Sequence, residues 1–182
     1  MSKLHDPACV AAATHCRAAD VAKNLELILT ALQTRGILTG NVAVGVLATV
    51  AVETAHTFEP VAEAYWLTPV ERARHFDQTE YGRVDPQTGQ RYYGRGFVQR
   101  TWRTGYQASA TALKIDCVTH PDLLLQPANA ANDLALFWAT KPGLVTACNA
   151  SQWPAVRRLV NGGTNGLEDF TACVTQLLLL AG

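Results

Sequence analysis

Two glutamates, Glu53 and Glu63, are the side chains best placed in this sequence for acid–base chemistry. Glu53 interrupts an apolar run near the end of a predicted helix, where burying a carboxylate is costly unless it is hydrogen-bonded or protonated. A carboxyl group in such a place can act as a general acid with a raised pKa, while a second carboxylate activates a water molecule as the base. The alternative interpretation of Glu53 is a solvent-facing side chain at the helix end.

The spacing of the two glutamates permits them to face each other across a cleft. In an unbroken helix they would lie about 15 Å apart along the axis, but Pro60 is expected to end the helix between them. The chain can then fold back and present Glu63 opposite Glu53. Inverting glycosidases hold two carboxyl groups roughly 6.5–9.5 Å apart, which leaves room for the attacking water. We interpret Glu59 and Glu71 as solvated surface charges.

Residues 92–102 combine aromatic rings, glycines and polar side chains. The glycines on both sides of Arg95 allow the backbone to approach a ligand or another strand closely. Aromatic rings beside polar donors suit sugars, whose C–H faces stack and whose hydroxyls need directional hydrogen bonds. The alternative is a β-hairpin with core aromatics and a structural arginine. No strand–loop–helix phosphate motif surrounds the glycines.

The elements that must position these residues are predicted to be mainly helical. Residues 8–38 carry apolar side chains at three- and four-residue steps, which predicts one long helix. Residues 41–57 are apolar on most sides and are predicted to form a central buried helix. Residues 69–90 are polar and predict a loop with short helical pieces. Further helices are predicted at 128–139, 154–160 and 168–180, with a glycine-rich turn at 161–166.

Length and composition predict one mainly α domain over residues 1–182. The chain is 48% hydrophobic and 16% charged, as in ordinary globular proteins. Its 15 Lys and Arg balance 15 Asp and Glu, which argues against nucleic acid as a partner but not against a neutral polysaccharide. No apolar stretch reaches the roughly 20 residues of a membrane span. The N-terminus does not resemble a secretory signal, so we expect a cytoplasmic protein.

The five cysteines are an odd number without the spacing of a disulfide framework, and we interpret them as free thiols. On one continuous helix, Cys9 and Cys16 would lie about 10 Å apart along the axis, too far to ligate one zinc ion together. The sequence therefore predicts no metal site.

Residues 92–102 resemble the signature Tyr-Tyr-Gly-Arg-Gly-x-x-Gln-x-Ser/Thr-Trp of glycoside hydrolase family 19, which contains plant-type chitinases and many phage endolysins. Residues 53–58 are similar to the family segment that carries the general acid. Residues 63–66 resemble the segment with the second carboxylate in compact phage members, and residues 160–163 match the family's Asn-Gly-Gly turn. These segments occur in the family's order and cover most of the chain.

The resemblance implies a lysozyme-like helical fold with a substrate cleft, at most a small β-hairpin, and an inverting mechanism without a cofactor. Glu53 would protonate the leaving oxygen, Glu63 would be the base on the water, and Thr101 would help to hold that water. Arg95 would be a structural cross-brace. Contacts with the sugar are expected from Tyr93, Gln99, Asn161, Trp66 and Trp102, the two tryptophans being core residues in the alternative reading.

The sequence departs from the family pattern at several places near these residues. Val52 stands where the family often has histidine, and His56 follows the acid with one extra residue before Phe58. Thr104 and Gly105 follow the signature at a place where the family often has asparagine. Phe170 occupies a position where arginine is frequent after the Asn-Gly-Gly turn. These changes affect the expected substrate contacts more than the expected reaction class.

On this resemblance we expect an endolysin-type N-acetylmuramidase that cuts the β-1,4 bonds of peptidoglycan glycan strands. It would be a monomer, the lytic domain of a larger phage lysin, held in the bacterial host cytoplasm until a holin releases it. The alternatives are a chitinase that acts on N-acetylglucosamine polymers and a saccharide-binding module that has lost catalysis.

Overall fold

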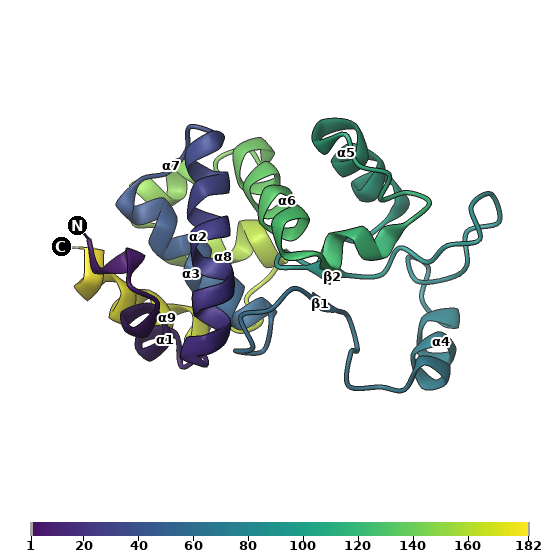
Figure 1. Cartoon of the computed structure of the whole chain (residues 1–182), viewed down its shortest axis with the longest axis horizontal. Coiled ribbons are helices and arrows are strands. Elements are labelled where there is room, and N and C mark those ends of the chain that lie inside the picture. The colour runs from purple at the N-terminus through teal and green to yellow at the C-terminus, as the bar shows by residue number, and fades with distance from the viewer. Residues whose placement is uncertain (1, 182) are drawn as a thin grey trace.

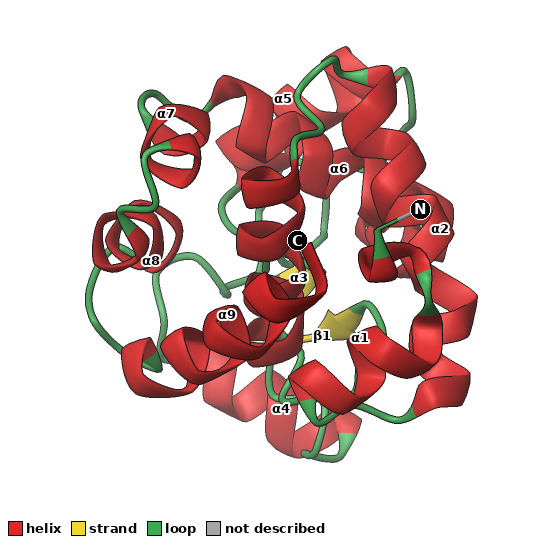
Figure 2. Ribbon diagram, turned by 90° about the vertical axis from the view of Figure 1, so that its left-hand side faces the viewer, coloured by secondary structure: helices red, strands yellow, loops and turns green. Residues whose placement is uncertain are grey.

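The computed structural model describes residues 2–181, which fold into helices joined by loops and one very short sheet (Figures 1 and 2). The mainly α class predicted from the sequence is therefore confirmed. The first half contains η1 (Lys3–His5), α1 (Pro7–Thr14), α2 (Ala18–Thr34), α3 (Gly40–Glu53), β1 (Val61–Ala62) and α4 (Pro69–Asp77). The second half contains β2 (Arg95–Gly96), α5 (Arg103–Leu113), η2 (Pro121–Leu125), α6 (Pro127–Thr140), α7 (Leu144–Asn149), α8 (Trp153–Asn161) and α9 (Leu167–Ala181).

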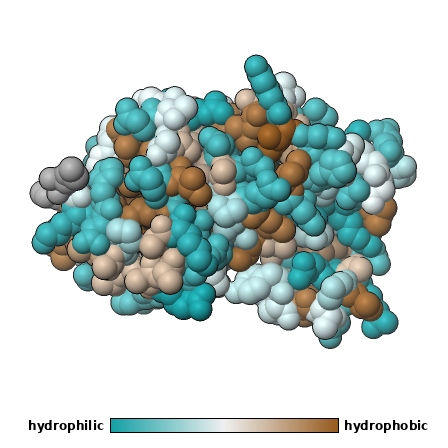
Figure 3. Space-filling view, viewed as in Figure 1, coloured by the Kyte–Doolittle hydropathy of each residue, from teal (hydrophilic) through white to brown (hydrophobic). Residues whose placement is uncertain are grey.

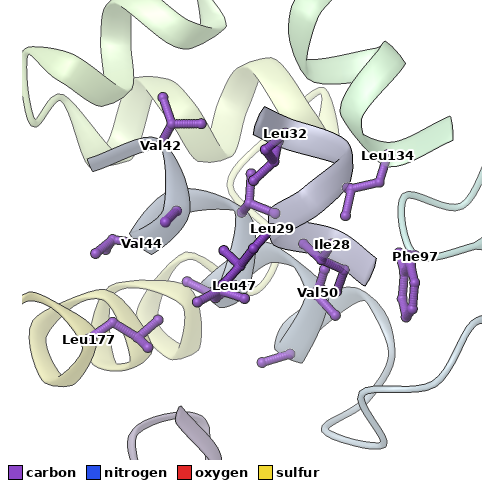
Figure 4. Packing of buried hydrophobic residues seen from close by; sticks show 14 of the residues in the cluster. Ile28, Leu29, Leu32, Val42, Val44, Leu47, Val50, Phe97, Leu134 and Leu177 are labelled. Atoms are coloured by element: carbon purple, nitrogen blue, oxygen red, sulfur yellow. The ribbon is translucent and has the colours of Figure 1, made fainter. Parts of the chain in front are cut away.

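Helix α3 is the centre of the main hydrophobic core. Every residue from Val42 to Ala51 is buried, as its all-round apolar sequence predicted. Helix α3 packs against α9, and its side chains belong to the same core cluster as Ile28, Leu29 and Leu32 of α2 (Figure 4). Gly45 brings α3 close to the second half of the chain, because a Cβ there would lie 2.8 Å from the Cys148 sulfur and 3.1 Å from the Trp138 ring.

The predicted single helix over residues 8–38 is wrong, because the chain bends after Thr14. His15 adopts a left-handed conformation with φ 55°, and the Cys16 amide donates to the Ala11 carbonyl to close α1. Helix α2 then starts at Ala18. Cys9 and Cys16 therefore do not share a helix, and the distance argument made for them does not apply.

Helix α3 ends at Glu53, seven residues before the proline that was expected to end it. The Thr54 hydroxyl donates to the Val50 carbonyl at 2.7 Å and accepts from the Phe58 amide at 3.0 Å, so its side chain competes with further helix formation. Ala55 and His56 follow with φ of 49° and 60°. Glu53 is thereby the last residue of the helix, where its carboxylate can leave the core.

Two helices were not predicted from the sequence. Helices α5 and α7 lie in segments rich in threonine, glycine and alanine, which contain few large apolar side chains to mark a helix. Helix α4, by contrast, is one of the helical pieces expected within residues 69–90. It starts with a capping box between Thr68 and Glu71.

The α4 arm, which we define as residues 64–90, lies to one side of the helical core, with β1 and β2 between the two (Figure 1). The arm is tied to the rest of the chain by Phe76, whose buried ring stacks on that of Tyr93 at a centroid distance of 4.4 Å. Arg91 adds hydrogen bonds to the Asp77 carboxylate at 2.6 Å and to the Gly82 carbonyl at 2.9 Å. Throughout residues 2–181, no helix is long and apolar enough to cross a membrane.

Substitution of Gly45 by alanine should destabilise the fold by about 1–3 kcal/mol, because the added methyl group would overlap the Cys148 sulfur in a packed core. Urea unfolding of Gly45→Ala against the wild type measures this. Gly40→Ala is the matched control, since a Cβ at Gly40 meets nothing within 4 Å. Equal stabilities of the two variants would contradict close packing at Gly45.

The free energy of unfolding should depend on pH through His56, which lies in the turn that follows α3. Its ring hydrogen-bonds the Thr14 carbonyl at 2.7 Å and the Asp169 carboxylate at 2.9 Å. Burial lowers the pKa of His56, but the Asp169 and Thr14 hydrogen bonds outweigh it, and the net pKa is raised. The stabilisation that these bonds give to protonated His56 should be present in full below the unfolded-state pKa of about 6.5. It should be lost as the pH rises through the folded-state value.

We therefore expect His56→Gln to cost up to about 1 kcal/mol of unfolding free energy in acid and less in alkali, as for a half-exposed ion pair. Urea unfolding of both proteins, at one pH below and one pH above the titration of His56, measures the difference. A cost that does not change with pH would rule out protonated His56 as the stabilising form.

Candidate active site

Glu53 and Glu63 line the same pocket, which has a volume of 160 Å³. Its walls come from the end of α3, from β1 and the residues that follow it, and from Gln99. In the space-filling view the surface is notched between the helical core and the α4 arm (Figure 3). The structure thus brings together the two carboxylates that the sequence paired, from elements on opposite sides of a chain reversal.

Glu53 forms an ion pair that the sequence did not predict. The guanidinium of Arg157 in α8 donates to Oε1 of Glu53 at 2.5 Å and, through Nε, to the carbonyl of Asn165 at 2.8 Å. The Arg157 side chain is only 4% exposed and that of Glu53 16%. Gly166, with φ 67°, leaves room for this arginine, since a Cβ there would lie 3.0 Å from its terminal nitrogen.

The sequence analysis did not identify Arg157. The one signal that could have done so is its position one helical turn before Asn161. The resemblance placed an arginine after the Asn-Gly-Gly turn, where this chain has Phe170. Phe170 is fully buried in the core. The guanidinium beside Glu53 therefore comes from the helix before the turn.

Glu63 is held by hydrogen bonds to both of its carboxylate oxygens. The Gly94 amide donates to Oε2 at 2.9 Å, and the Tyr81 hydroxyl donates to Oε1 at 2.7 Å. The Glu63 amide donates in turn to the Gly94 carbonyl at 2.7 Å, next to the β1–β2 pair. Glycine at residue 94 leaves room for Gln99 and Glu63, because a Cβ there would lie 2.6 Å from the Gln99 amide oxygen and 3.2 Å from Oε2 of Glu63. Tyr81 lies in the polar segment 69–90 and was missed by the sequence analysis.

Gln99 faces the pocket and ties the signature segment to β1. Its amide nitrogen donates to the carbonyls of Val61 at 3.1 Å and Gly96 at 3.0 Å. The Thr101 hydroxyl donates to the Gln99 carbonyl at 2.7 Å, and Thr101 is not among the residues that line this pocket. Its expected role in holding the water stays a prediction.

Tyr93 and Arg95 form a stack instead of an open sugar-binding surface. The Arg95 guanidinium lies 3.8 Å from the centroid of the Tyr93 ring, whose other partner is Phe76. Arg95 is 3% exposed and also bonds Asp122 and the Tyr106 hydroxyl, which fits the expected cross-brace. Because the Tyr93 ring already has stacking partners, any contact it makes with a sugar is expected at its edge.

The two candidate tryptophans are exposed, so neither belongs to the core. Trp66 lines the pocket beside both glutamates and is 72% exposed. Trp102 is 47% exposed, and its ring is tilted against that of Tyr81 at 5.8 Å. Asn161 is the last residue of α8 and is half-buried, and the structure does not place it among the residues that line the pocket.

Backbone strain is concentrated in the segments that form the site. Nine described residues other than glycine have positive φ, and six of them lie at 55–64 and 99–102. Positive φ in such residues is costly and persists only where the surrounding structure enforces it. Buried Asn24 supplies part of that enforcement, since its amide donates to the Phe58 carbonyl at 2.8 Å and to Glu59 at 3.2 Å. Between Ser2 and Ala181, no three His, Cys, Asp or Glu side chains are grouped so that they could hold a metal ion.

Two bacterial chitinase structures resemble this fold over nearly the whole chain. Chitinase C from Streptomyces griseus HUT6037 has a TM-score of 0.68 and 21% identity, and the match covers 98% of this chain and 77% of that one. A second bacterial family 19 chitinase has a TM-score of 0.67 and 21% identity, with 96% and 95% covered. At this identity the likeness shows the fold, and it confirms the expected lysozyme-like class.

Plant chitinases are the curated relatives with matching sequences. Chitinase 8 of Oryza sativa subsp. japonica is 35% identical over 79 residues, which is 40% of this chain and 30% of the relative. Basic endochitinase B of Arabidopsis thaliana is 36% identical over 70 residues, or 36% and 21% of the two chains. The matched part thus spans less than a third of either plant protein.

The family model of class I chitinases matches residues 48–158. This segment is more than half of the chain and contains both pocket glutamates, the β1–β2 pair and the Tyr-Gly-Arg-Gly signature. The protein therefore belongs to glycoside hydrolase family 19, the family of the class I chitinases.

Proposed function

We propose that this glycosidase hydrolyses β-1,4-linked N-acetylglucosamine polymers of the chitin type by an inverting mechanism with two carboxylates. The observation that carries the proposal is the pocket in which Glu53 and Glu63 meet from different elements, each with its own polar partners. Two carboxyl groups and a water molecule suffice for glycoside hydrolysis.

Glu53 is proposed as the general acid. In its protonated form it gives its proton to the glycosidic oxygen as the bond from that oxygen to the anomeric carbon breaks. The carboxylate left behind carries a charge, and the guanidinium of Arg157, 2.5 Å from Oε1, is placed to neutralise it. Burial of Arg157 keeps water from competing for this contact.

Glu63 is proposed as the base. It takes a proton from a water molecule whose oxygen attacks the anomeric carbon from the face opposite the leaving group, so the configuration inverts. Glu63 ends the turnover protonated and Glu53 ionised, and exchange with solvent restores both. Trp66, exposed on the pocket wall, offers a face on which a sugar ring can stack.

A charged pocket beside the catalytic one favours peptidoglycan as a second candidate substrate. It has a volume of 370 Å³, and Tyr81 and Trp102 form part of its wall. Its charged side chains are Glu80, Arg83, Asp85 and Arg103. Chitin is uncharged, whereas the lactyl and peptide substituents of peptidoglycan carry charges that such a surface can bind.

If peptidoglycan is the substrate, we propose that the protein acts as the N-acetylmuramidase of a phage lysin. It would then be held in the host cytoplasm until a holin releases it. Expression in bacteria with and without a membrane-permeabilising agent tests this. Lysis only after permeabilisation would support the setting, and growth that is unaffected in both cultures would contradict it.

Replacement of Glu53 by glutamine should reduce kcat about 10²–10⁴-fold, because the amide cannot donate the proton that general acid catalysis supplies. Chromatography of products from soluble chitin oligosaccharides measures the loss, and NMR of the first product reports its anomeric configuration. Glu26→Gln, a change of the same type on the exposed face of α2, should retain full activity.

An active Glu53→Gln enzyme would remove Glu53 from the role of acid. A retained anomeric configuration in the wild-type product would contradict the inverting mechanism. Binding of oligosaccharides without turnover by the wild type would favour a saccharide-binding module instead.

The two candidate substrates should be separable by the fragments that the wild-type protein releases. We expect hydrolysis of chitin oligosaccharides, and mass spectrometry of treated peptidoglycan tests the second candidate in parallel. New reducing-end muramic acid would identify a muramidase, and reducing-end glucosamine a glucosaminidase. Turnover of chitin alone would leave the charged pocket without a role in substrate choice.

A further inference from the structure

We propose that Tyr81 is a positioning residue for the catalytic base, and that the α4 arm serves the reaction by delivering its hydroxyl group to Glu63. This inference rests on the proposed function, because Tyr81 acts only through Glu63. Nothing in the polar sequence around it, residues 78–85, distinguishes this tyrosine from a surface residue.

The geometry fixes the plane of the Glu63 carboxylate from two sides. The Tyr81 hydroxyl donates to one oxygen at 2.7 Å and the Gly94 amide to the other at 2.9 Å. Rotation of the carboxylate would break both bonds at once. Each oxygen keeps a further lone pair, so the fixed group can still accept a proton from the attacking water.

A tyrosine is chemically suited to this task. Burial and the neighbouring Glu63 carboxylate raise the pKa of Tyr81 to about 12, so the hydroxyl remains a donor at any pH at which the enzyme is expected to work. Hydrogen bonds from neutral donors favour the ionised form of a carboxylate, which is the form that a base needs. Because the phenol is neutral, it reduces the basicity of the Glu63 carboxylate less than a cationic donor would.

The Tyr81 ring is fixed by its neighbours independently of the hydroxyl. It lies edge-on to Phe76 at 6.1 Å and is tilted against Trp102 at 5.8 Å. Gly82, the next residue, lets the chain pass close to Phe76, because a Cβ there would lie 2.5 Å from that ring. Arg91 clamps the segment at Asp77 and at Gly82. Removal of the hydroxyl alone should therefore leave the ring in place.

Tyr81 does not line the pocket that holds the two glutamates, although Glu63 does. Tyr81 instead forms part of the wall of the charged pocket. The hydroxyl, committed to Glu63, is thus expected to influence the chemical step more than the binding of a short substrate.

The test is Tyr81→Phe with a short soluble oligosaccharide as substrate. We expect kcat to fall about 10–100-fold, which corresponds to the loss of a hydrogen bond to a charged group, with KM within about twofold of the wild type. The acidic limb of the pH profile of kcat should move to higher pH, because the ionised base has lost a donor. A merely structural role would not move that limb.

Thr175→Val is the control, because it also removes one hydroxyl group. Thr175 is exposed on α9, and its hydroxyl donates to the Thr171 carbonyl at 2.9 Å, outside both pockets. This change should leave kcat and the pH profile unchanged. Melting curves of both variants establish that each is folded under the assay conditions.

A double-mutant cycle with Glu63→Gln separates this inference from the proposed function. We expect Tyr81→Phe to cost nothing further in the Glu63→Gln enzyme, assayed at high enzyme concentration. Full activity of Glu63→Gln would overturn both the base assignment and this inference. An inactive Glu63→Gln beside a Tyr81→Phe enzyme with wild-type kcat, or equal losses from Tyr81→Phe in both backgrounds, would overturn this inference alone.

Discussion

The abrupt end of helix α3 at Glu53 is the constraint on which the rest of the site depends. A helix buried on all sides can present a carboxylate to solvent only at its end, and Thr54 stops it there by hydrogen-bonding both Val50 and Phe58. The left-handed residues that follow turn the chain back toward β1. The same turn is anchored from α2 by Asn24, so the strain near Glu53 is balanced by contacts from the core.

The two glutamates obtain their polar partners in different ways. Glu53 faces a buried guanidinium from α8, which joins the end of α3 to the glycine-rich turn before α9. Glu63 is bound by a backbone amide and a phenol, both neutral, beside the short sheet. A cation lies beside one carboxylate and neutral donors lie beside the other, so the two groups have different electrostatic surroundings.

The helical core and the start of the α4 arm both contribute to the proposed substrate-facing surface. The core supplies Glu53, while the residues at the root of the arm supply Glu63 and the exposed Trp66. The arm is fastened by an aromatic stack and by Arg91. Its further wall, with Trp102 and four charged side chains, extends the surface beyond the reacting bond. We propose that the pocket with the two glutamates carries the chemistry and that this outer wall distinguishes a neutral from a charged glycan.

The sequence by itself determined the mainly α class, the buried central helix, the paired glutamates and the signature around Arg95, because apolar period and short motifs are local properties. It misplaced the break after Thr14 and the end of α3, which depend on side-chain hydrogen bonds to the backbone that periodicity does not register. Only the tertiary structure brought Arg157 to Glu53 across 104 residues and Tyr81 to Glu63 across 18. Contacts over such separations follow from how the helices pack and where the chain turns, and no spacing within one segment encodes them.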